Sequence, residues 1–220
     1  AGPPVVCDYT PKGTVSKIGD LDTYFIGSGP KCIVVVYDIF GFSTQAKQAS
    51  HQPLENRAIH RLFAAAGFNV AMPDFCEGKH WLVENFPPKD KRVFELHAWF
   101  GSTGDWDTAI LPKFTATVAH MKEHKGAEVL GLAGFCWGGM ISMKAAALGA
   151  DGGLTATACC HPAMLSPELA EKVTVPVLIM PSGEEPDHAP LKEVLDKKPF
   201  GDKCEYRRFD DMHHGFCAAR

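Results

Sequence analysis

The chain lacks the features that mark nucleic-acid-binding and membrane-spanning proteins. Its 220 residues carry 22 Lys and Arg against 26 Asp and Glu, a net charge of −4. That balance leaves no positive excess to neutralise phosphates or an anionic membrane surface. No apolar run approaches the about 20 residues that cross a bilayer, and no secretory signal pattern is seen. We therefore expect a cytoplasmic protein whose partners include neither nucleic acid nor a membrane.

Metal-binding cysteine patterns are also missing. The chain has eight cysteines, but they form no C-x-x-C pair and no zinc-like spacing. Several lie in apolar runs, where a free cysteine behaves as a small core residue. A chain of this length does not need disulfides for stability, so we expect a reducing compartment. Because the zinc-like spacing is missing, we expect no metal site.

What the chain does contain is an alternation of apolar runs and helical patterns. The length fits a single domain over residues 1–220, and strands that alternate with helices predict an α/β fold with a mainly parallel central sheet flanked by helices. Residues 1–19 read as a loosely attached segment. The predicted strands are 21–27, 32–37, 68–73, 127–133, 154–160, 175–181 and 204–209, and the predicted helices are 53–66, 107–123, 140–148 and 190–197.

The stretch around Cys136 carries the strongest chemical signal. A buried strand leads into Gly134-Phe135-Cys136-Trp137-Gly138-Gly139, and a helix rich in small residues follows. Strand, Gly-x-nucleophile-x-Gly and helix is the pattern of a nucleophile elbow, with a cysteine where a serine is common. The turn is so tight that its neighbours must have almost no side chain, which glycine provides. The helix N-terminus beneath the sulfur favours the thiolate form.

A cysteine nucleophile needs a base, and two histidines near the C-terminus are candidates. His213 and His214 follow the last predicted strand, whose carboxyl end meets that of the elbow strand at one edge of a parallel sheet. We favour His214, because Gly215 after it allows a close approach and Phe216 can anchor the loop.

The histidine in turn needs a carboxylate that fixes its tautomer and orientation. Three acids follow the predicted strand 175–181: Glu184, Glu185 and Asp187. We favour Asp187 and keep the two glutamates as alternatives. Nucleophile, acid and base then occur in the chain order of α/β-hydrolase triads.

Acyl transfer also requires donors for the developing oxyanion. The backbone N–H of Trp137, directly after the nucleophile, is the first candidate. The second is the backbone N–H of Ile39, in the loop that follows strand 32–37. His161, Trp81 and Phe40 are candidate substrate contacts.

Several of these motifs together resemble the dienelactone hydrolase family. They are Tyr37-Asp38-Ile39-Phe40-Gly41, Met72-Pro73-Asp74-Phe75, the Gly134–Gly139 elbow, His161-Pro162 and His214-Gly215-Phe216. The resemblance extends from about residue 15 to residue 216. It implies an α/β-hydrolase fold, a Cys136–His214–Asp187 triad, and oxyanion donors at Ile39 and Trp137. It also implies hydrolysis of esters or lactones without a metal or organic cofactor.

The chain departs from the family pattern at three places. Asp38 stands where many members have a glutamate, a carboxylate that is thought to hold the thiol dormant until substrate binds. Well-studied members hold the substrate carboxylate with two arginines. Arg92 is the only candidate here for the first, and Arg220 lies near the second at a different spacing from the histidine.

The sequence therefore predicts a monomeric cysteine hydrolase of small esters or lactones that works through an acyl-thioester on Cys136. The alternative is a non-catalytic or redox-sensing protein of the same fold, in which Cys136 is oxidised instead. An amidotransferase or peptidase ranks last, because the chain lacks a synthetase partner domain.

Overall fold

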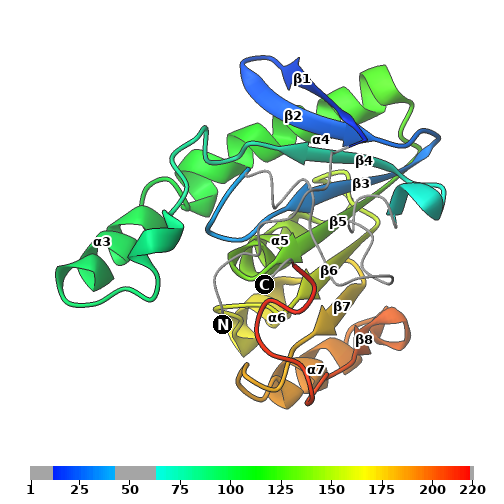
Figure 1. Cartoon of the computed structure of the whole chain (residues 1–220). Coiled ribbons are helices and arrows are strands. Elements are labelled where there is room, and N and C mark those ends of the chain that lie inside the picture. Colours follow the sequence, from blue (N-terminus) through cyan, green and yellow to red (C-terminus); the bar gives the residue numbers. More distant parts are fainter. Residues whose placement is uncertain (1–11, 43–62, 219–220) are drawn as a thin grey trace.

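The computed structural model describes residues 12–42 and 63–218, and these residues build one eight-stranded sheet (Figure 1). The strand order is β1-β2-β4-β3-β5-β6-β7-β8. The strands are β1 (Thr14–Ile18), β2 (Leu21–Ile26), β3 (Lys31–Val36), β4 (Asn69–Pro73), β5 (Val129–Phe135), β6 (Ala156–Cys160), β7 (Val177–Met180) and β8 (Glu205–Tyr206).

The sheet is mainly parallel, as the sequence predicted. Strands β1, β2 and β4 pair antiparallel, whereas every pairing from β4 through β3, β5, β6 and β7 to β8 is parallel. The chain places β4 on one side of β3 and β5 on the other. Such a reversal is the point where ligands bind in open α/β sheets, at the carboxyl ends of the strands.

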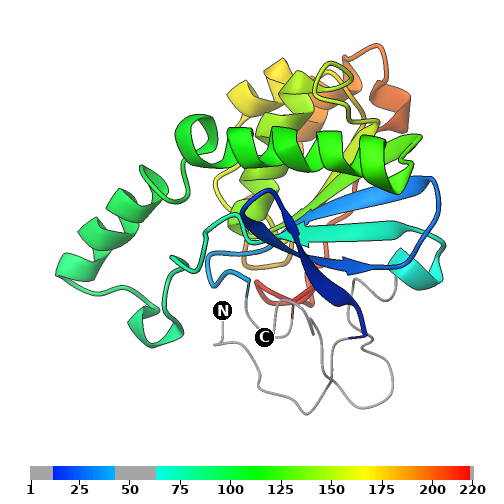
Figure 2. The ribbon, with the colours of Figure 1, turned by 90° about the horizontal axis from the view of Figure 1, so that it is seen from above.

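Four of the described helices pack against this sheet. In Figure 2, α4, α5, α6 and α7 lie along the same face, while α3 stands away from the sheet. The helices are α3 (Lys91–Phe100), α4 (Leu111–Lys125), α5 (Trp137–Leu148), α6 (Pro167–Lys172) and α7 (Ala189–Asp196), with short turns η1 (Val83–Asn85), η2 (Trp106–Ile110) and η3 (Gly201–Lys203).

The central strands are buried because both of their faces are covered. In β3, the five residues after Lys31 are all buried, as expected for a continuous β-branched run within a parallel sheet. Alternate residues of β6 face opposite sides. Cys160 therefore packs in the larger core with the elbow, whereas Cys159 packs in a second core with α6, α7 and β7.

Three predicted elements differ from the observed ones. Residues 14–18, predicted as part of a loose segment, form the edge strand β1, whose first four residues are exposed and therefore carry no apolar pattern. The last strand is limited to Glu205–Tyr206. The helix predicted at 107–123 is split into the π-helical turn η2 and α4. Most of the helix predicted at 53–66 lies outside the described residues.

Candidate active site

Cys136 lies on a strained turn between β5 and α5. Its φ is +55° and its ψ is −114°, a combination that costs energy in a residue with a side chain. The glycines around it are required by space. A Cβ on Gly134 would lie 1.8 Å from the Gly138 carbonyl oxygen, and one on Gly138 would lie 2.3 Å from the Val36 carbonyl oxygen. The elbow therefore packs backbone against backbone, and larger residues would displace it.

Backbone hydrogen bonds hold the turn against the end of β6. The Cys136 N–H donates to the Cys160 carbonyl at 3.1 Å, and the Cys136 carbonyl accepts from the Gly139 and Ala163 N–H groups at 2.9 Å each. The side chain of Cys136 projects from a backbone whose two polar groups are both occupied. Its position is consequently fixed by the fold rather than by the loop alone.

His214 reaches Cys136 from the segment that follows β8. The imidazole interacts with the Cys136 side chain closely enough to raise its own pKa, and its Nδ1 lies 2.6 Å from Oε1 of Glu185. Gly215, with a φ of +96°, adopts a conformation that favours glycine directly after the histidine. The structure thus brings together the sulfur and the imidazole that the sequence placed 78 residues apart.

The surroundings of His214 favour its protonated form. Burial lowers the pKa of the imidazole, but its interactions with Cys136 and Glu185 outweigh burial and raise the pKa to about 9. For Glu185, burial raises the pKa, yet hydrogen bonds from His214 and Ser182 outweigh it and lower the pKa. At neutral pH the pair is therefore an imidazolium beside a carboxylate, and a cation beside a thiol is the environment in which reactive thiolates form.

The carboxylate against His214 is Glu185, which corrects our choice of Asp187. The Glu185 side chain is 4% exposed. Its oxygens accept from the Ser182 hydroxyl at 2.9 Å and from the Ser182 N–H as well as facing His214. Asp187 is exposed and its carboxylate accepts from the Ala189 N–H at the start of α7. The third candidate, Glu184, accepts from the His214 backbone N–H at 3.0 Å.

The two proposed oxyanion donors lie on adjoining pieces of backbone. Trp137 is the first residue of α5, where the N–H has no partner within the helix. The loop of Ile39 is fixed beside it, because Gly138 packs against the Val36 and Tyr37 carbonyls. The Ile39 carbonyl accepts from the Trp81 N–H at 2.8 Å, so this loop is held from the other side too.

Asp38 belongs to the same loop. Its Oδ1 accepts from the Phe40 N–H at 2.8 Å, and its carbonyl accepts from the Gly41 N–H at 3.1 Å. The carboxylate therefore shapes the turn that carries Ile39. Control of the Cys136 thiol by Asp38 stays a prediction.

The three candidate substrate contacts are all buried. His161 is fully buried, and its ring lies 5.1 Å from that of His214 and 5.9 Å from that of Phe216, edge-on in both cases. Trp81 and Phe40 are 6% and 3% exposed. His161 thus supports the His214 ring directly, and contact of any of the three with substrate stays a prediction.

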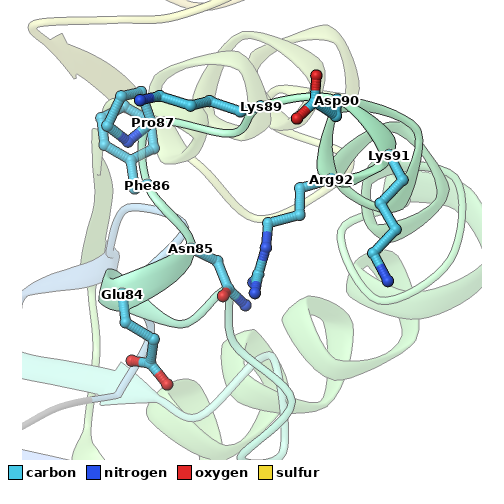
Figure 3. A pocket seen from close by; sticks show the side chains of 8 residues that line it. All are labelled: Glu84, Asn85, Phe86, Pro87, Lys89, Asp90, Lys91 and Arg92. Carbon is cyan, nitrogen blue, oxygen red and sulfur yellow. The ribbon is translucent and has the colours of Figure 1, made fainter.

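Arg92 lies in a separate pocket. Figure 3 shows this pocket between η1 and the start of α3, with a volume of about 370 Å³ and with Arg92 and Asn85 among the residues that line it. Neither Cys136 nor His214 lines it. Arg220, the other arginine considered, lies outside the described residues.

Two residues of the site carried no signal in the sequence. Ser182 is fully buried and donates to Glu185 through both its hydroxyl and its N–H. Arg208 binds the backbone of the loop that carries Glu185. A lone serine and one of two adjacent arginines match no motif, so only their spatial placement reveals them.

Within residues 12–42 and 63–218, no group of three or more His, Cys, Asp or Glu side chains is placed to hold a metal ion. In the same part of the chain, no helix has both the length and the apolar character needed to cross a membrane. The seven cysteines that the structure describes are free thiols.

Comparison with known proteins decides the family. Residues 22–220 match the dienelactone hydrolase family. The chain belongs to this family. Among curated members of related sequence, an uncharacterised AIM2 family protein of Schizosaccharomyces pombe is 33% identical over 96% of this chain and 82% of its own length. The hydrolase pyvD of Aspergillus violaceofuscus is 26% identical, over 93% and 79% of the two chains.

Solved structures confirm the α/β-hydrolase fold of this dienelactone hydrolase family member. A dienelactone hydrolase-like promiscuous phosphotriesterase from metagenomic libraries superposes with a TM-score of 0.64, at 18% identity, over 93% of this chain and 83% of that one. The Pyrococcus furiosus esterase Pf2001 superposes with a TM-score of 0.57, at 14% identity, over 95% and 87%. The prediction of the family and of its fold is confirmed.

Proposed function

We propose that this dienelactone hydrolase family member hydrolyses small carboxylic esters or lactones through an acyl-thioester on Cys136. The observation that carries the proposal is the His214 ring, whose Nδ1 lies 2.6 Å from Glu185 and whose pKa is raised by its interaction with Cys136. A nucleophile, a base and an acid that orients the base form the arrangement required for acyl transfer.

In the first half of the reaction, the Cys136 thiolate attacks the ester carbonyl carbon. The N–H groups of Trp137 and Ile39 stabilise the negative oxygen of the tetrahedral intermediate. As the intermediate collapses, the C–O bond to the leaving group breaks and the imidazolium of His214 gives its Nε2 proton to the leaving alkoxide. An alcohol departs, or, with a lactone, remains attached at the far end of the acyl group.

In the second half, a water molecule attacks the thioester carbonyl. Neutral His214 accepts a proton from this water, and Glu185 stabilises the imidazolium that results. Collapse of the second intermediate releases the carboxylic acid and returns the Cys136 thiolate. The names of related proteins support ester or lactone substrates, since they include a hydrolase and carboxymethylenebutenolidase homologues.

The experiment is hydrolysis of p-nitrophenyl acetate and a lactone panel, combined with intact-mass detection of an acyl adduct. We expect Cys136→Ala to abolish both turnover and the adduct. The matched control is Cys204→Ala, which removes a thiol from the segment before β8 and should leave both unchanged. Full turnover by Cys136→Ala would refute the proposal. Rapid sulfenic acid formation at Cys136, with no adduct from any ester, would favour the redox-sensing alternative.

A further inference from the structure

Arg208 lies two residues beyond β8, on the segment that leads to His214. We propose that it is a positioning residue of the proposed hydrolase: its guanidinium fixes the loop over residues 183–186 so that the Glu185 carboxylate meets His214. This inference rests on the proposed function, but the contacts that support it are independent of any substrate.

Three carbonyl groups of the loop over residues 183–186 accept hydrogen bonds from this one guanidinium. Nη2 donates to the Gly183 carbonyl at 3.1 Å and to the Glu185 carbonyl at 3.2 Å, and Nη1 donates to the Pro186 carbonyl at 3.2 Å. The loop therefore curves around the cation, with the backbone of Glu185 itself bound. The side chain of Glu185 is held separately, by the hydroxyl and N–H of Ser182.

The same guanidinium also binds a residue of its own segment, the one that leads from β8 to His214. Its Nε donates to Oδ1 of Asp210 at 2.6 Å. Two backbone contacts reinforce the link: a β-bridge joins Ser182 to Phe209, and the Gly183 N–H donates to the Met212 carbonyl at 3.0 Å. Arg208 thus sets the distance between the two segments whose side chains form the Glu185–His214 pair.

The geometry requires arginine rather than any cation. A guanidinium presents its donors in one rigid plane, which suits several carbonyl acceptors at once, whereas a lysine ammonium is a flexible point charge. Lysine at position 208 would keep the charge beside Asp210 and lose the simultaneous bonds to the three carbonyls. A role limited to charge balance would be satisfied by lysine, and a positioning role would not.

The test compares Arg208→Lys and Arg208→Met with the matched control Arg207→Met. Arg207 is the adjacent, exposed arginine, whose guanidinium lies over the Phe209 ring at 5.2 Å. The first readout is the NMR resonance of the proton between His214 Nδ1 and Glu185, assigned by its loss in His214→Asn. We expect this resonance to shift or broaden in both Arg208 variants and to stay in place in Arg207→Met.

The second readout is the kinetics of p-nitrophenyl acetate hydrolysis. We expect both Arg208 variants to lower kcat on the order of 10- to 100-fold, as small misplacements of catalytic groups do, with KM nearly unchanged. Arg207→Met should behave as the wild type in both parameters.

The two readouts separate failure of this inference from failure of the proposed function. An unchanged resonance in folded Arg208→Lys overturns the positioning role, whether or not Arg208→Met folds. If the resonance changes as expected but the wild type hydrolyses no ester, the positioning role stands and the hydrolase proposal falls.

Discussion

Replacing Glu185 by Gln tests the acid of the proposed triad most directly, because the structure defines what each oxygen of Glu185 accepts. Oε1 faces His214 Nδ1 and the Ser182 hydroxyl, and Oε2 faces the Ser182 N–H. Glutamine has one amide oxygen and one NH₂ group, so one of these donors must face an NH₂ group. If the oxygen faces the Ser182 N–H, His214 must present an unprotonated Nδ1, which is the wrong tautomer for transfer at Nε2.

The size of the effect follows from the pKa of His214. The difference between the ordinary 6.5 and about 9 corresponds to about 3 kcal/mol in favour of the imidazolium. Cys136 and Glu185 both contribute to this stabilisation of the imidazolium. Glu185→Gln removes the contribution of the Glu185 charge, and the altered tautomer of His214 lowers the rate further. We therefore expect Glu185→Gln to lower kcat/KM for p-nitrophenyl acetate by about 100-fold or more.

The matched control is Asp187→Asn, two residues away. Asp187 is exposed and its carboxylate accepts from the Ala189 N–H at the start of α7, so this change should leave kcat/KM close to the wild-type value. The assay is the pH dependence of ester hydrolysis by the wild type, Glu185→Gln and Asp187→Asn. A large loss in Asp187→Asn with little change in Glu185→Gln would restore Asp187 as the acid and refute our assignment.

Three further predictions concern stability. Because the pKa of His214 is raised, its contribution to the free energy of unfolding is complete below about pH 6.5 and is lost as the pH rises to about 9. In urea unfolding, the free energy of unfolding should therefore fall between these pH values, and it should fall less in His214→Asn. An equal fall in the two proteins would contradict the raised pKa. Gly138→Ala places a Cβ 2.3 Å from a β3 carbonyl and should cost at least about 2 kcal/mol, whereas Gly131→Ala, whose nearest neighbour is 3.6 Å away, should fold normally. Tyr37→Phe leaves the buried Cys76 N–H without the hydroxyl that it binds at 2.8 Å and should lower the free energy of unfolding by about 1–3 kcal/mol; an unchanged urea midpoint would count against this network.

Most of the sheet could be predicted because its central strands are covered on both faces. The run 32–37 shows this burial as continuous apolar sequence. The edge strands show no such run, since Thr14–Ile18 is largely exposed and Glu205–Tyr206 is only two residues long. An edge strand is defined by its partner, which the sequence does not display.

At the candidate site, the placement of Cys136 on the elbow and of His214 near it could be predicted, and the carboxylate beside His214 could not. Each of the first two is fixed by local requirements: glycines around a tight elbow, and a glycine directly after the histidine. Glu184, Glu185 and Asp187 share one loop, and their order along the chain says nothing about which carboxylate turns inward. That choice depends on Ser182, in the same loop, and on Arg208, whose contacts with the loop arise only once β7 and β8 are paired.

The shortness of β8 has a consequence for how this molecule would fail under stress. β8 pairs with β7 at two positions, a single β-bridge between Ser182 and Phe209 follows, and the base of the proposed triad lies on the chain beyond them. Edge elements with few partners open at lower free energy than the centre of a sheet. On gentle warming, ester hydrolysis should therefore be lost while far-ultraviolet circular dichroism still reports intact helices. Loss of activity would then indicate local opening of the sheet edge at β8 rather than global unfolding.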